Sequence, residues 1–252
     1  MNDITTASIV FGILAGSTLL GIRLRAILPP PHLSAEAKDS IRVAMGSVAT
    51  MTALVLGLLI ASTKGAYDTE RSEVTQMAAK VDYLDHALTN YGSETKETRV
   101  LLRSTVEAAL ARIWSKESSK HEHLEPSAAW AEALPNSIQA LSPQNDAQRA
   151  FKFQAMQLTS EIGQMRWLLY QQTDSAISLP LLVIVVSWLA IIFVSLGLFA
   201  PSNPTVVIAL MLAVFAVAGA IFLILDLDGP FSGLIKISSA PMRNTLQHLG
   251  PP

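Results

Sequence analysis

Four long stretches of this chain carry no charged residue, and they restrict the possible folds more than any other feature of the sequence. They span residues 4–22, 43–61, 177–199 and 206–225. A helix needs about 20 apolar residues to cross the ~30 Å hydrocarbon core of a bilayer, and each stretch is close to that length. The sequence therefore predicts an all-α protein with four transmembrane helices, in contact with membrane lipid.

The overall composition agrees with this prediction and narrows the range of partners and cofactors. Half of the 252 residues are hydrophobic and 15% are charged, whereas soluble domains average about 25% charged residues. The net charge of −2 gives no reason to expect a nucleic-acid partner. The absence of cysteine excludes disulfides, iron–sulfur clusters and thiolate zinc sites, and we expect no cofactor.

The second apolar stretch is part of a longer predicted helix, from Ser34 to Tyr91. Ser34 is a typical N-cap, Glu36 follows in the first turn, and Gly92 suits the position after the helix end. Beyond the membrane the apolar residues alternate at intervals of three and four, which is a heptad pattern and predicts a coiled-coil-like packing face. These positions are Tyr67, Val74, Met77, Val81, Leu84, Leu88 and Tyr91.

These patterns divide the chain into four parts. Residues 1–63 form a transmembrane hairpin, residues 64–175 a helical extramembrane domain, and residues 176–228 a second hairpin. Residues 229–252 form an amphipathic tail. The extramembrane domain is therefore an insert between the second and third spans.

Within the insert, a second amphipathic helix is expected to end near Lys116, followed by a charged loop. Residues 126–141 are expected to form one or two short helices broken at Pro135. A further helix is expected to begin at Ser142, with Pro143 in its first turn, and to pack against the Ser34–Tyr91 helix.

Small residues lie on one face of the second span, which suggests close packing against another helix. Two interpretations are open: the face lines a pore or contacts a second copy of the chain, or it packs on another span of the same chain. A weaker pattern of the same kind is Ser8, Gly12 and Gly16 in the first span. The face in the second span consists of Gly46, Thr50, Ala53, Gly57 and Ala61.

No motif for phosphate binding, nucleophilic catalysis or zinc-dependent proteolysis is present, so an enzyme is not expected. No ionisable residue lies within a span, which argues against proton-coupled transport and intramembrane proteolysis but not against a passive pore. His121 and His123 lack a fixed third ligand, so no metal site is expected there. Asp226 and Asp228 either end the fourth span or form pore-mouth carboxylates that attract cations.

Charge gives one indication of orientation in the membrane. The connector between the first two spans holds Arg23, Arg25, Lys38 and Arg42. The positive-inside rule places this connector in the cytoplasm and the helical domain outside. Basic residues also flank the spans on the domain side, so both orientations remain open at this point.

Two segments resemble a known family. The first is Ala49–Ser62 (ATMTALVLGLLIAS), and the second is the tail. They resemble the bestrophin-like family of bacterial multi-span membrane proteins over nearly the whole chain, which implies a bacterial inner membrane. The matching residues outside the first segment are Tyr67, Asp68, Asp228, Pro230, Phe231, Gly233, Ser239, Ala240 and Pro241.

The order of two spans, helical insert, two spans and tail is also similar to that of bestrophins. These are pentameric ion channels whose helical insert lies in the cytoplasm. The resemblance implies an oligomeric, channel-like protein that conducts ions, with a cytoplasmic insert. Residues 43–61 contain no aromatic side chain and the chain has no acidic run, so anion preference and calcium gating are not implied. The alternative is a non-conducting scaffold or sensor that binds a partner through its helical domain.

Overall fold

The computed structural model describes residues 3–114, 128–171, 179–201, 203–231 and 233–249, which are helical with no strand among them. The predicted all-α class is confirmed. The chain divides into two compact units. Unit 1 comprises Met1–Ala66 and Ala176–Asp228, and unit 2 comprises Tyr67–Ser175 and Gly229–Pro252.

Four helices are long and apolar enough to cross a membrane, as the sequence predicts: α1, α2, α6 and α7. The helical insert between the second and third of them is also confirmed. The helices are α1 (Asp3–Ile27), α2 (Ala35–Tyr91), α3 (Lys96–Ile113), α4 (Ala128–Gln139), α5 (Asp146–Gln171), α6 (Leu179–Phe199), α7 (Pro204–Leu227) and α8 (Ala240–His248), with 3₁₀ turns η1 (Pro30–Leu33) and η2 (Ser93–Thr95).

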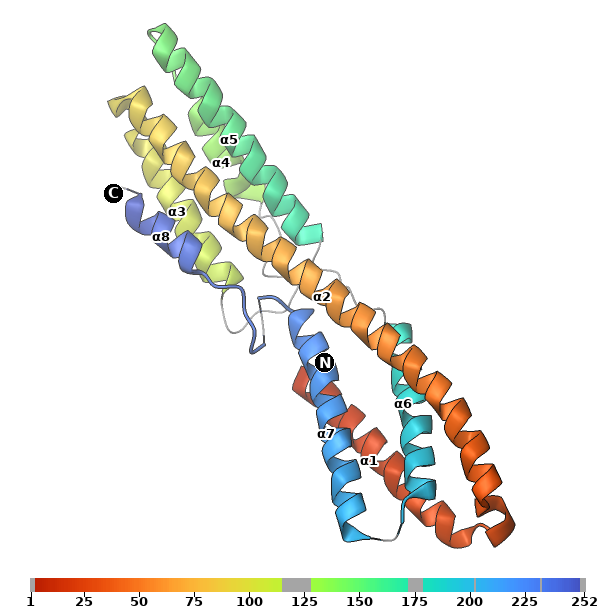
Figure 1. Cartoon of the computed structure of the whole chain (residues 1–252). Coiled ribbons are helices and arrows are strands. Elements are labelled where there is room, and N and C mark those ends of the chain that lie inside the picture. Colours follow the sequence, from red (N-terminus) through yellow and green to blue (C-terminus); the bar gives the residue numbers. More distant parts are fainter. Residues whose placement is uncertain (1–2, 115–127, 172–178, 202, 232, 250–252) are drawn as a thin grey trace. The chain divides into compact units, whose positions relative to one another are not determined.

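In unit 1, α1 packs against both α6 and α7 (Figure 1). The first part of α2 joins this core through Leu59, with Val55 and Leu56 packed around it. Pro180 lies in the first turn of α6, where the missing amide hydrogen costs no helical bond. The buried core residues are Val10, Leu14, Leu59, Leu182, Val185, Leu189, Phe193, Val214, Ile221 and Ile224.

The closest approach between α1 and α6 is at Gly21 and Gly197. A Cβ atom on Gly21 would lie 2.8 Å from the backbone nitrogen of Leu198 and 3.0 Å from Cα of Gly197. In the other direction, a Cβ atom on Gly197 would lie 3.1 Å from the backbone nitrogen of Ile22. The neighbours are backbone atoms, which cannot rotate away as a flexible side chain can. Only glycine therefore fits at either position.

Hydroxyl groups inside unit 1 bond to the helix that carries them. Thr18 Oγ1 donates to the Leu14 carbonyl at 2.9 Å, and Thr63 Oγ1 donates to the Leu59 carbonyl at 2.9 Å. Thr52 bonds in the same way to the carbonyl four residues earlier. A polar group in hydrocarbon needs such a partner because no water is present there.

Both ends of α2 follow the sequence prediction. The Ala37 amide donates to Ser34 Oγ at 3.2 Å, so Ser34 is the N-cap. Gly92 has φ 132°, a conformation that glycine adopts readily and other residues rarely do. Thr95 Oγ1 then donates to the carbonyl of Leu88 at 2.7 Å, and so satisfies a carbonyl that the end of the helix leaves without an amide partner.

The predicted heptad positions form the core of unit 2, since all seven are at most 8% exposed. In this unit α2 runs beside α3 and α5 (Figure 1), and their side chains share one hydrophobic core with α4 and the C-terminal segment. The predicted contact between α2 and α5 is confirmed by the bond from Lys80 to Glu161 and by Gln148 Nε2, which donates to the Tyr91 carbonyl at 3.0 Å.

A bidentate ion pair fastens α3 to α2. Arg99 Nε and one terminal nitrogen donate to the two carboxylate oxygens of Asp85 at 2.6 and 2.8 Å. These hydrogen bonds raise the pKa of the Arg99 guanidinium above its ordinary value. The pair is half-buried, where two parallel charge-assisted bonds fix the orientation of the helices as well as stabilise them.

The tail folds onto unit 2. Trp114 Nε1 donates to the Ile237 carbonyl at 2.8 Å, and the Trp114 ring meets Phe231 edge-on with centroids 5.8 Å apart. In α8, Thr245 Oγ1 bonds to Asp82 Oδ2 at 3.1 Å. The tail therefore contributes to the helical core of this unit.

Two local expectations within the insert are wrong, and a third is not tested by the described residues. Helix α4 is not broken at Pro135 but continues through it, because Leu134 and Ile138 on either side are buried in the core. Helix α5 begins at Asp146 rather than Ser142, because Asn145 Oδ1 accepts the Gln148 amide at 2.8 Å and caps the helix there. The predicted charged loop lies outside the described residues.

The Gly21–Gly197 contact generates a testable prediction. Gly21→Ala should lower the stability of the protein in detergent by about 1–3 kcal/mol, because the methyl group overpacks a backbone contact. Gly16→Ala on the same helix is the control, since no atom lies within 4 Å of a Cβ built there. Thermal unfolding in detergent measures both variants. Equal unfolding temperatures for the two would show that this helix crossing is looser than described.

Candidate functional site in the membrane unit

The membrane segment of α2 has one face that packs against the rest of unit 1. Leu59 and Thr52 are buried on this face, and Val55 and Leu56 are partly buried beside them. At 3.6 residues per turn these positions lie on one side of the helix. The remaining circumference of the segment is not covered by the described residues of unit 1.

The small-residue stripe lies on an uncovered face. All five of its members are exposed, and no atom lies within 4 Å of a Cβ built on Gly46 or Gly57. The interpretation that this stripe packs on another span of the same chain is therefore wrong. The physical reason is that larger side chains of the segment, Val55, Leu56 and Leu59, pack into the core of unit 1 instead. The stripe consists of Gly46, Thr50, Ala53, Gly57 and Ala61.

A third face of the same segment is also exposed but has a different character. It carries Met51, Leu54 and Leu58, three large apolar side chains. Large flexible side chains suit contact with lipid tails, whereas small residues permit close approach of another backbone. The two uncovered faces of α2 therefore differ in what they fit, and only the small-residue face is shaped for a protein neighbour or an open path.

The two carboxylates at the end of the fourth span lie in different environments. Asp226 is 1% exposed, while Asp228 is half-buried and forms the C-cap of α7, where its amide donates to the Ile224 carbonyl at 3.2 Å. Both take part in polar interactions within the chain. Of the predicted pair, only Asp228 presents part of its surface to solvent in a single chain.

His121 and His123, at which the sequence gives no reason to expect a metal site, both lie outside the described residues. Among the residues that the structure describes, no three histidine or acidic side chains come together as a possible metal site. The described part of the chain therefore offers no metal chemistry on which to base a function.

Sequence reasoning missed the Gly21–Gly197 contact and noted only the weak spacing pattern of Gly12 and Gly16. These two glycines are exposed and have open space beside them. Spacing by four identifies small residues that share a face, but it does not say which face meets a neighbour. The usable signal was that Gly21 and Gly197 each lie near the end of a predicted span.

The chain shows clear similarity at the level of a family. The family model for the Bestrophin-like domain matches residues 6–242, which include all four candidate spans and the insert. The chain belongs to the bestrophin-like family. This membership and the apolar helices together make it a membrane protein. No curated protein and no solved structure matches this bestrophin-like chain.

The exposed small-residue face predicts that a second protein surface packs on it. Gly57→Phe should leave the fold of one chain intact, because the space at this position is open, but should shift the protein in detergent toward the monomer. Leu58→Phe is the matched control, because Leu58 lies on the face of large apolar side chains that suits contact with lipid. Light scattering coupled to chromatography measures the mass. An assembly that withstands Gly57→Phe and dissociates with Leu58→Phe would assign the contact to the other face.

Proposed function

We propose that this bestrophin-like protein forms a homo-oligomer in the bacterial inner membrane and conducts ions along the small-residue face of α2. The observation that carries the proposal is that this face lies in the membrane segment and that no described helix of unit 1 covers it. An uncovered face of glycine, alanine and threonine leaves room for an aqueous path around a symmetry axis, or for close contact between neighbouring copies.

The chemistry of the face fits passive conduction. Residues 43–61 contain no ionisable side chain, so nothing in this segment binds an ion tightly enough to hold it. The Thr50 hydroxyl donates to the Gly46 carbonyl at 2.9 Å and still has lone pairs that can accept hydrogen bonds from water. Ions would therefore pass in a largely hydrated state, with weak selectivity along the segment itself.

Selectivity would instead come from the mouth of the path. Asp228 is a partly exposed carboxylate at the end of the fourth span. In an oligomer it would recur once in each subunit and form a ring of negative charge, which attracts cations. Asp226 would support this ring from a buried position rather than face the ions.

We place the helical insert in the cytoplasm. The family resemblance supports this side, because bestrophins carry their insert there. The four basic residues of the first connector favour the opposite orientation. The family argument concerns the whole chain, whereas the charge argument concerns one connector, so the family argument is preferred.

The alternative function is a non-conducting scaffold or sensor. It is favoured by a cavity within unit 2, since a ligand bound there could bias the conformation of the protein. The heptad face is not available to a partner, because its residues form the core of unit 2. A partner protein would therefore have to bind another surface of the insert.

Ion flux tests the proposal. The purified full chain in liposomes should pass monovalent cations, and Asp228→Asn should reduce the cation flux several-fold by removing the charge at the mouth. Asp146→Asn, an exposed carboxylate on α5, is the control and should have no effect. An oligomer without flux would favour the scaffold or sensor. A strict monomer would end the channel proposal, because four spans without internal charge leave little room for a pore.

Orientation is tested with one thiol in a chain that has no cysteine of its own. Cysteine at Ser118, between α3 and α4, should resist an impermeant thiol reagent in intact cells and react after permeabilisation. His32→Cys in the first connector lies on the opposite side of the membrane and should show the reverse. Labelling of the Ser118 position in intact cells would place the insert outside.

A further inference from the structure

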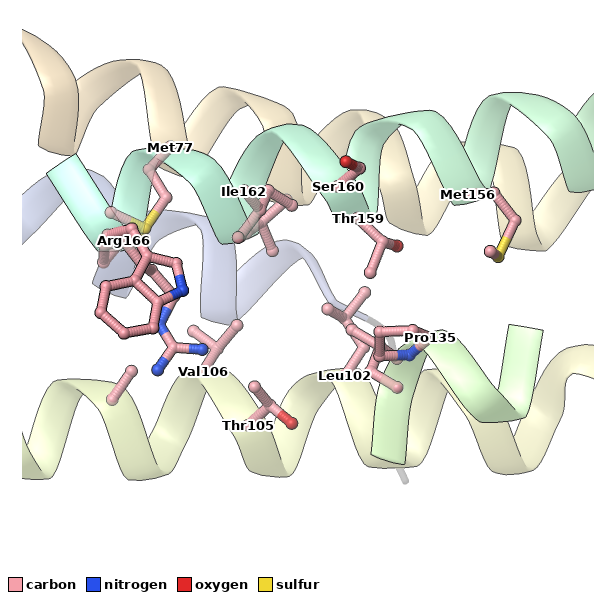
Figure 2. A pocket seen from close by; sticks show the side chains of 16 residues that line it. Met77, Leu102, Thr105, Val106, Pro135, Met156, Thr159, Ser160, Ile162 and Arg166 are labelled. Atoms are coloured by element: carbon pink, nitrogen blue, oxygen red, sulfur yellow. The ribbon is translucent and has the colours of Figure 1, made fainter. Parts of the chain in front are cut away.

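Unit 2 contains a cavity of about 390 Å³ between α3 and α5, to which α2, α4 and α8 also contribute (Figure 2). This volume lies within the ~300–1,000 Å³ that is usual for small-molecule sites. The cavity belongs entirely to unit 2, and its chemistry can be read without reference to the membrane segments.

The walls of the cavity are mainly apolar. Met77, Leu102, Val106 and Ile162 are typical of them, and hydroxyl groups from Thr105, Thr159 and Ser160 lie among these side chains. Arg166 is the ionisable residue among the described lining residues. The cavity therefore combines a long apolar surface with one cationic group.

The cation lies at one end of the cavity. In Figure 2 the Arg166 side chain projects from α5 toward Val106 on α3, while Met156, on the same helix, lies at the opposite end of the cavity. Ten residues of α5 separate Arg166 from Met156, which corresponds to about 15 Å along the helix axis at ~1.5 Å per residue. A ligand that matches this arrangement has a charged head and an extended apolar chain.

The electrostatic environment at this end favours an anion. Burial of the guanidinium and, next, repulsion by Arg112 on α3 lower the pKa of Arg166 below its ordinary value. Both effects disfavour the charged form of the side chain. A negative group bound between α3 and α5 would favour the charged form of Arg166, because it would lie close to two arginines.

We propose that this cavity binds a single-chain amphipathic anion, such as a fatty-acid carboxylate. The headgroup lies at Arg166, where the planar guanidinium can hold both carboxylate oxygens, and the alkyl chain extends along α5 toward Met156. Thr159 and Ser160 lie along this route, six to seven residues from Arg166, and suit a ligand with a further polar group partway along its chain. Such ligands are available to a membrane protein from the surrounding lipid, and the inference does not depend on ion conduction.

Equilibrium binding tests the proposal with the full chain in phosphatidylcholine nanodiscs and radiolabelled laurate as the probe. Saturable binding above that of empty nanodiscs is expected, near one laurate per chain. Arg166→Gln should weaken it at least tenfold. Arg149→Gln is the matched control, because Arg149 is an arginine on the same helix whose side chain is 70% exposed, and it should change nothing. Dodecyltrimethylammonium, with the same chain and the opposite charge, should not compete.

A second variant covers the case in which Arg166→Gln does not fold. Gly163 lines the cavity, and no atom lies within 4 Å of a Cβ built on it. Gly163→Leu should therefore occupy the cavity without strain, and leucine is also the better helix former. We expect laurate binding to be lost while the unfolding temperature stays equal to or above that of the wild type.

Three results would overturn the proposal. One is laurate binding no greater than in empty nanodiscs, and another is saturable binding that neither Arg166→Gln nor Gly163→Leu weakens. The third is competition by dodecyltrimethylammonium as strong as that by unlabelled laurate, which would show that the site selects a chain and not an anion.

Discussion

A bilayer offers no water to the backbone, and this constraint shapes unit 1. Every amide and carbonyl in the hydrocarbon core must bond within its own segment, so each charge-free stretch becomes a helix. The threonine hydroxyls of these helices obey the same rule, as the bonds of Thr18 and Thr63 to their own helices show. The hydrophobic effect does not draw helices together in lipid, so contact depends on shape. Gly21 and Gly197 provide this fit in shape, because they let the backbones of α1 and α6 approach closely.

Helix α2 contributes to both units and uses a different driving force in each. Its membrane segment buries few residues, because lipid is as good a neighbour as a side chain. From Tyr67 onward, burial of the heptad positions removes apolar surface from water and stabilises a helical core. Polar pairs such as Asp85 with Arg99 then fix how the neighbouring helices are aligned. A single helix, α2, is therefore stable both in lipid and in water, for a different reason in each.

Two places in the structure support the two proposals made for this protein. The small-residue face of α2 has the shape for a close neighbour but none in this chain, and it supports the proposal of an oligomer with an ion path. The cavity of unit 2 places Arg166 at the end of an apolar space, where burial disfavours its charge, and it supports the proposal of an amphipathic anion. The two lie in different units and rest on separate observations.

The sequence by itself determined the four spans, the ends of α2 and the buried heptad positions, because these depend on local composition, capping and periodicity. Only the tertiary structure decided which small residues meet a neighbour. Spacing gave only a weak indication at Gly12 and Gly16, whereas Gly21 and Gly197 make the contact, since periodicity defines a face but not its direction. The tertiary structure also decided that Pro135 stays within a helix and that Arg166 lines a cavity. Both depend on residues distant in the chain, whose packing outweighs the local preference.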